Sequence, residues 1–166
     1  MKRLIILLSL FIFSSLAFAQ TSLSNEDYAV LFFKKLNQTQ TKLTYMNKKG
    51  SLAKVGTETI NGDISGTLFY DVKIKGLGAV VTLRYTNYSD EDGWTFDGEI
   101  ITKSNMAQNG TLDGIITVIG DYAGKVYYEN AILKDGNPGD GTYGIEQNNQ
   151  PREEVSYQTY LKSKEN

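Results

Sequence analysis

The sequence contains no cysteine and no histidine. Without them the chain cannot form a disulfide bond, a Ser-His or Cys-His nucleophile pair, or a zinc site with thiolate or imidazole ligands. It also has no phosphate-binding loop of the Walker type. These absences exclude the commonest hydrolase and metalloenzyme sites, so we expect no catalytic residues and no cofactor.

Long apolar runs are also missing, with one exception at the N-terminus. Two basic residues precede the apolar run 4–13, and a small Ala-Phe-Ala segment follows it. This order predicts a signal peptide over residues 1–19, with cleavage before Gln20. No later stretch approaches the roughly 20 apolar residues that a membrane-spanning helix needs. We therefore expect a periplasmic or secreted protein with no membrane span after cleavage.

An excess of basic charge is missing as well. The whole chain has 17 basic and 19 acidic residues, and removal of the signal peptide leaves 15 basic residues and a net charge of −4. Nucleic-acid binding needs a basic stripe, so we expect no nucleic acid partner, and the net charge does not favour an anionic membrane surface. The remaining residues, 20–166, are enough for a single domain with its own core.

What the sequence does contain is strict alternation of apolar and polar residues between turns. Asn61-Gly62 and Asn109-Gly110 are dipeptides typical of two-residue hairpin turns. The alternation predicts a mainly β fold, a curved antiparallel meander of about seven or eight strands that forms a partial or closed barrel. The residues expected on its buried face include Ile64, Leu68, Tyr70, Val72, Ile74, Ala79, Val81, Leu83 and Tyr85.

The ends of the domain have different patterns. Ser24 followed by acidic residues resembles a helix N-cap, so we expect one short helix over 25–36 that covers part of the concave face of the sheet. Residues 37–42 then serve as a polar connector. Residues 42–50 and 51–60 are possible additional strands, and the charged segment 151–166 is either a final edge strand or a short helix.

An internal repeat is the second organising feature. Residues 83–98 and 126–141 align without gaps at an offset of 43, and six of sixteen positions are identical. We interpret them as parts of two duplicated hairpin units, about 63–98 and 111–146. The alternative is coincidence between glycine-rich turns.

Three glycines interrupt otherwise apolar strands at Gly66, Gly98 and Gly114. By the period of two, each points toward the buried face, where a missing side chain allows a sheet to bend or another element to approach. We expect them to mark a crease in the sheet. The competing interpretation places Gly98 and Gly114 in tight turns between shorter strands.

Aromatic residues provide one candidate binding surface. Five of them cluster in the repeat units, and two of these are adjacent, so one of the pair must face away from the core. Exposed aromatic rings suit sugar stacking or protein contact, whereas buried ones support the sheet through cross-strand pairs. The five residues are Tyr85, Tyr88, Trp94, Tyr127 and Tyr128.

Carboxylates provide the remaining candidate chemistry. Acidic loops recur in both repeat units and suggest weak calcium binding, although tight turns favour the same residues. Asp97 and Glu99 lie two positions apart on one strand face, where a glycosidase pair is conceivable but burial is not predicted. The candidate calcium ligands are Asp90, Asp92, Asp97, Asp135, Asn137 and Asp140.

These observations favour an exported, non-catalytic β-sheet protein that binds a small molecule or a protein partner. One alternative is a periplasmic carrier that holds a lipid in a barrel hollow. It would resemble lipocalins and lipoprotein carriers in architecture only, because the lipocalin Gly-x-Trp signature is absent. A small carbohydrate-active enzyme and an outer-membrane barrel are weaker alternatives. The polar ending "KSKEN" argues against the barrel.

Overall fold

A computed structural model of the chain describes residues 23–46, 55–134, 137–138, 141–147 and 150–158. The predicted signal peptide lies outside the described residues, and so do residues 47–54 between the first helix and the first strand.

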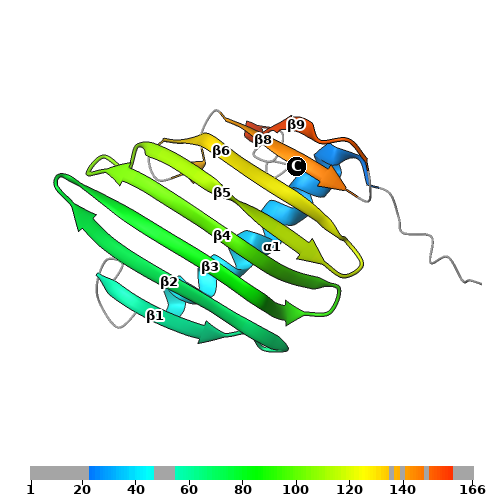
Figure 1. The fold of residues 1–166 in the computed structure, drawn as a ribbon, viewed down its shortest axis with the longest axis horizontal. Helices are drawn as coiled ribbons and strands as arrows, with labels where there is room; N and C mark the ends of the chain where they lie inside the picture. Colours follow the sequence, from blue (N-terminus) through cyan, green and yellow to red (C-terminus); the bar gives the residue numbers. More distant parts are fainter. Residues whose placement is uncertain (1–22, 47–54, 135–136, 139–140, 148–149, 159–166) are drawn as a thin grey trace, which may run out of the picture.

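The described chain forms an α-helix followed by one antiparallel sheet (Figure 1). The elements are α1 (Asn25–Met46), β1 (Gly56–Asn61), β2 (Ser65–Lys75), β3 (Gly78–Glu91), β4 (Trp94–Asn105), β5 (Gly110–Ile119), β6 (Gly124–Lys134), β7 (Asn137–Pro138), β8 (Thr142–Gln147) and β9 (Glu153–Ser156).

The strands are arranged in the order β1-β2-β3-β4-β5-β6-β8-β9, and the short β7 pairs with the end of β6. The predicted antiparallel meander is confirmed, in its open form, because β1 and β9 lie at opposite edges and do not pair. In the C-terminal segment, β9 confirms the edge strand, and residues 157–158 after it are helical. Strand β1 confirms a strand within 51–60, whereas residues 42–46 of the other expected strand belong to α1.

Helix α1 begins where the sequence predicts. The Ser24 hydroxyl accepts a hydrogen bond from the Asp27 N–H at 3.1 Å, which caps the first turn. The expected end at Leu36 is wrong, because the helix continues to Met46 through the residues interpreted as a connector. The continuation has a buried face: Thr39 is only 3 % exposed and packs toward the sheet. Tertiary contact therefore stabilises a polar segment whose own pattern does not indicate a helix.

Helix α1 crosses one face of the sheet diagonally, from β8 and β9 toward β1 (Figure 1). We call this the inner face and the opposite side the outer face. Tyr28, Phe32, Phe33 and Leu36 of α1 are all buried, and Phe32 meets Phe96 edge-on at 6.1 Å between ring centroids. Each such side chain contributes about 1.5–3 kcal/mol when it is fully buried. The concave side is therefore filled by the helix.

The predicted buried face is largely confirmed, with Leu68, Tyr70, Val72, Leu83 and Tyr85 all in the core. Ala79 and Val81 are half-buried.

The prediction of burial is wrong for two residues of that face. Ile64 is 55 % exposed because it lies in the turn between β1 and β2. Ile74 is 61 % exposed because it lies near the end of β2, which α1 does not cover (Figure 1).

The three strand glycines lie inside β2, β4 and β5, as the crease hypothesis requires, and not in turns. Their role differs from the expected one. A Cβ on Gly114 would lie 2.0 Å from the Glu99 carbonyl oxygen, and one on Gly98 would lie 2.2 Å from that of Ile115. A Cβ on Gly66 would likewise lie 2.1 Å from the carbonyl oxygen of Asn87. The missing side chains therefore admit the backbone of the neighbouring strand, and do not simply leave room on the inner face.

The two aligned segments share a backbone irregularity. Asn87 and Asn130, which the 43-residue offset pairs, both have positive φ, at 46° and 52°. Each N–H donates to a carboxylate of an adjacent strand, Asp97 at 3.1 Å and Asp113 at 2.9 Å. The segments then diverge, because β4 has 12 residues and β7 has two. The duplication of whole hairpins stays a prediction.

Candidate functional site

The predicted aromatic residues are mostly core residues. Tyr85, Tyr88, Trp94 and Tyr128 are each 4 % exposed or less, so they form no exposed surface. Tyr127 alone of the five lies on the outer face, where it is half-buried. The cross-strand interpretation therefore describes four of the five.

The predicted calcium ligands that the structure describes do not converge on one site. Asp90 is held by Lys42, Asp97 by the N–H of Asn87, and Asp92 is exposed in the turn before β4. Among the described residues, no group of three or more acidic side chains is placed to hold a metal ion. Asp135 and Asp140 lie outside the described residues, as does the side chain of Asn137.

Asp97 and Glu99 share the outer face of β4, as predicted, but both already have polar partners. Glu99 accepts from Arg84 at 2.8 Å (Nε) and 2.6 Å (Nη2). Neither carboxylate is buried. A glycosidase acid must be held protonated by burial, and this strand face does not provide it.

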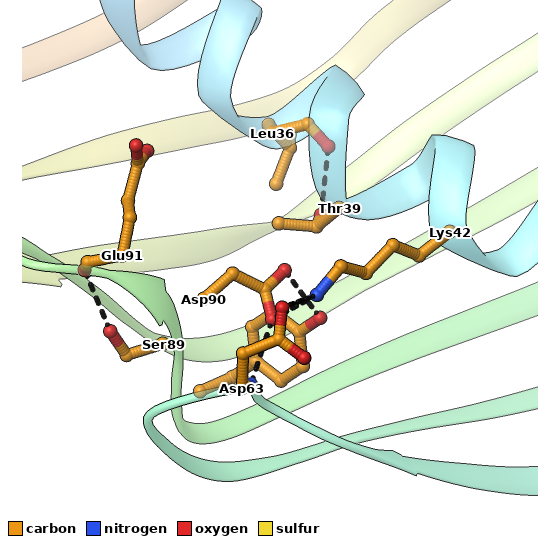
Figure 2. Close-up of polar contacts among 8 residues, drawn as sticks. Leu36, Thr39, Lys42, Asp63, Ser89, Asp90 and Glu91 are labelled. Carbon is orange, nitrogen blue, oxygen red and sulfur yellow. Dashed lines mark hydrogen bonds and ion pairs between the residues drawn. The ribbon is translucent and has the colours of Figure 1, made fainter.

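A polar cluster joins the second half of α1 to the sheet (Figure 2). The Lys42 ammonium contacts Asp63 in the β1–β2 turn and Asp90 of β3, the latter at 2.7 Å. Tyr88 donates its hydroxyl proton to Asp90 at 2.7 Å, and the N–H of Asp63 donates to the same carboxylate at 3.1 Å. Two turns earlier on the helix, the Lys35 ammonium forms an ion pair with the Glu91 carboxylate at 2.6 Å.

The cluster fixes the charge of its central carboxylate. Burial acts to raise the pKa of Asp90, but hydrogen bonds from Lys42, Tyr88 and the backbone outweigh it and hold the pKa below its ordinary value of 3.8. Burial and the bond to Asp90 raise the pKa of Tyr88. All groups are mutually satisfied, so this cluster positions α1 and offers no free acid, base or nucleophile.

A continuous row of residues crosses six strands on the outer face. Strand register places these residues side by side, from β2 to β8, and we call them the outer-face row. The row consists of Phe69, Arg84, Glu99, Ile115, Tyr127 and Gly144.

Arginines order the aromatic rings of this row. The Arg84 guanidinium lies 5.8 Å from the Phe69 ring centroid, and that of Arg152 lies 4.6 Å from the Tyr127 ring. Arg152 also binds Glu129 through both terminal nitrogens, at 2.8 and 3.1 Å, and Glu154 at 2.9 Å. The hydrogen bonds to Glu129 and Glu154 raise the pKa of Arg152 and keep it charged.

Gly144 explains why Arg152 can lie there. A Cβ at Gly144 would stand 2.2 Å from the Arg152 Nε, so with any other residue at this position the guanidinium would have to shift from its place over the strand. Sequence reasoning missed Arg152, since it stands in a charged C-terminal segment. The weak signal that was available is a glycine between Tyr143 and Ile145, two buried residues of β8.

A groove of about 370 Å³ continues from this row. The groove begins where the pairing between β6 and β8 ends, next to the pair formed by Tyr127 and Gly144. Glu129 belongs to both features, because it lines the groove and binds Arg152. The groove is lined by Glu129, Asn130, Ala131, Ile132, Gly141, Thr142, Ser156 and Gln158.

No family model, curated protein or solved structure matches this chain. No helix in the described part of the chain is long and apolar enough to cross a bilayer.

Proposed function

We propose that this chain is an exported, non-catalytic protein that binds a protein partner through the outer face of its sheet. The observation that carries the proposal is the exposure of apolar side chains on that face. Ile115, Ile119 and Ile132 are 46 %, 48 % and 50 % exposed, on two adjacent strands. The register places Ile115 directly beside Tyr127, and Ile119 and Ile132 lie further along the same face, four residues away along the strands. We take the pair formed by Ile115 and Tyr127 as the centre of the contact surface.

The neighbouring residues favour a protein over a sugar. Tyrosine and arginine are the residues most often found at the energetic centre of protein interfaces, and here Tyr127 and Arg152 are already ordered. A sugar needs a free aromatic ring to stack on, whereas Arg152 lies over the ring of Tyr127.

The filled interior makes the carrier alternative less attractive. A lipid in the concave side would have to displace Phe32, Leu68 and Ile116, each 0 % exposed. Export rests on the signal-peptide pattern of residues 1–19 alone, and it places the protein in the periplasm or outside the cell.

Site-specific photo-crosslinking in the producing cell tests the proposal. A photoreactive amino acid at position 115 should give one discrete cross-linked band, and the same residue at position 34, an exposed lysine site on α1, should not. Adding Ile119→Asp in the same chain should abolish the band at position 115, because it places a charge in the proposed contact surface.

Circular dichroism of the Ile119→Asp variant provides the folding control. Absence of a band at position 115, equal bands at both positions, or a band that survives in the folded Ile119→Asp variant would contradict the proposal.

A further inference from the structure

Two hairpin connections lie side by side at one end of the sheet, between β2 and β3 and between β4 and β5 (Figure 1). The N–H of Met106 donates to the carbonyl oxygen of Leu77 at 3.0 Å, which ties the two connections together. These two residues are the most exposed large apolar residues of the described chain, at 79 % and 80 %. Ile74, beside them on β2, is 61 % exposed.

Local folding does not account for these side chains. The turn between β2 and β3 requires glycine at its first position, where Gly76 has a φ of 57°. Its second position, Leu77, has no such requirement and would ordinarily hold a polar residue. Met106 likewise occupies a turn, and no residue of the described part of the chain covers it.

The charges on these two connections are basic. Segments 73–80 and 102–109, "KIKGLGAV" and "TKSNMAQN", contain three lysines and no acidic residue. Lys73 and Lys103 contact Asp71 and Asp113 on their own or the next strand, yet their side chains stay 65 % and 63 % exposed. We call Lys73, Ile74, Lys75, Leu77, Lys103 and Met106 the tip surface.

Three connections at the opposite end of the sheet are acidic. These segments, 61–65, 89–94 and 119–124, contain five acidic residues and no lysine or arginine. Lysines of α1 neutralise part of this charge through Asp63, Asp90 and Glu91. The two basic connections and the three acidic connections therefore lie at opposite ends of the strands that they join.

We infer that the tip surface docks the protein on an anionic lipid bilayer. Apolar side chains that project from two linked turns, flanked by lysines, combine the two forces that hold proteins at membrane interfaces. The lysines are attracted to lipid phosphates while Leu77 and Met106 enter the boundary region, and the three acidic connections point away from the surface. The net negative charge of the chain does not oppose this, because at physiological salt charges interact over only about 8 Å.

Vesicle co-sedimentation of the purified protein tests the inference. The protein should sediment with vesicles of equal parts phosphatidylcholine and phosphatidylglycerol, far less with phosphatidylcholine alone, and less at high salt. The triple variant Lys73→Gln, Lys75→Gln, Lys103→Gln should bind the anionic vesicles at least tenfold more weakly. The double variant Leu77→Ser, Met106→Ser should lose a similar amount, since it removes the inserted groups.

Two matched controls keep the test specific. Ile64→Ser removes an exposed isoleucine from the opposite end, and Lys125→Gln removes a lysine from the start of β6; neither should change vesicle binding. Failure of the wild type to bind either vesicle would overturn the inference and would favour a protein partner for the tip surface. Anionic-vesicle binding that the tip variants do not reduce would overturn it as well. The outer-face crosslink at position 115 is independent of both results.

Discussion

At the residue scale, the absence of a side chain at Gly114 has a specific consequence. Its φ of 144° lies in the region that other residues rarely adopt, and a Cβ would meet the Glu99 carbonyl oxygen of β4. Two separate costs therefore oppose any substitution there: a strained backbone and a collision with the neighbouring strand.

We expect Gly114→Ala to lower the free energy of unfolding by about 2–4 kcal/mol, and Gly114→Val by more. Urea denaturation followed by circular dichroism measures the change. Gly56→Ala is the matched control, since Gly56 also has positive φ but has open space around it. It should cost only about 1 kcal/mol, from backbone strain alone. Equal losses in the two variants would show that the close approach of β4 is not what requires glycine.

Alternation predicted the position of many side chains, and its failures have local causes. Leu83 and Tyr85 are two apart and share the inner face as predicted. Tyr88 is three positions from Tyr85 and should face outward, yet it is fully buried. The bulge at Asn87 adds one residue to β3 and turns Tyr88 to the inner face, and a second register shift follows between Tyr88 and Glu91. Sequence periodicity cannot detect such a bulge, because asparagine is equally common in ordinary turns.

At the scale of elements, the contacts of α1 with the β1–β2 turn and the C-terminal end of β3 determine how far the helix extends. The sequence "NQTQTK" indicates a connector when it is considered alone. The acidic partners of its Lys42, Asp63 and Asp90, are 21 and 48 positions away. No local pattern could have predicted the helix end, because these pairings exist only after the sheet has formed.

The same cluster makes part of the stability depend on pH. The pKa of Asp90 is lowered on folding, so its contribution is fully present above its ordinary pKa of 3.8 and is lost as the pH falls through the lower folded-state pKa. We expect Asp90→Asn to reduce stability at neutral pH. We also expect the unfolding free energy of this variant to fall less steeply below about pH 4 than that of the wild type.

Urea midpoints measured from neutral pH down to about pH 2 test this expectation. Asp121→Asn, at an exposed turn position on the same end of the sheet, is the control and should retain the acid dependence of the wild type. An unchanged acid slope in Asp90→Asn would mean that the Lys42 and Tyr88 contacts do not hold this carboxylate ionised.

At the scale of the whole molecule, one helix on one face leaves the sheet with two unequal sides. The inner side is closed by Tyr28, Phe32 and Leu36, which are buried against the strands. The outer side and the strand ends remain available for contact. The binding proposals follow from this asymmetry, since a filled interior leaves only the outside of the molecule to recognise anything.

The overall architecture was predictable to a greater extent than the site. The alternation from Leu68 to Val72 and the recurrent turn residues indicate an antiparallel meander locally. The two-residue turn expected at Asn61-Gly62 is wrong, because Asn61 still pairs with Thr67 and the connection is longer. Closure was not predictable, because it depends on whether β1 and β9, which lie at the two ends of the sheet, can meet. The outer-face row could not be predicted from the sequence either, because strand pairing in the folded sheet is what brings Arg84, Ile115 and Arg152 to the same face.

Hydrogen exchange of the α1 backbone tests most directly whether the interior is filled. If α1 and the central strands share one core, amides of residues 29–39 should exchange as slowly as those of β3, β4 and β5, by global unfolding. Exchange of the helix that is much faster than exchange of these strands would mean that α1 opens as a lid. That result would contradict a filled interior and favour a carrier with its ligand site beneath the helix.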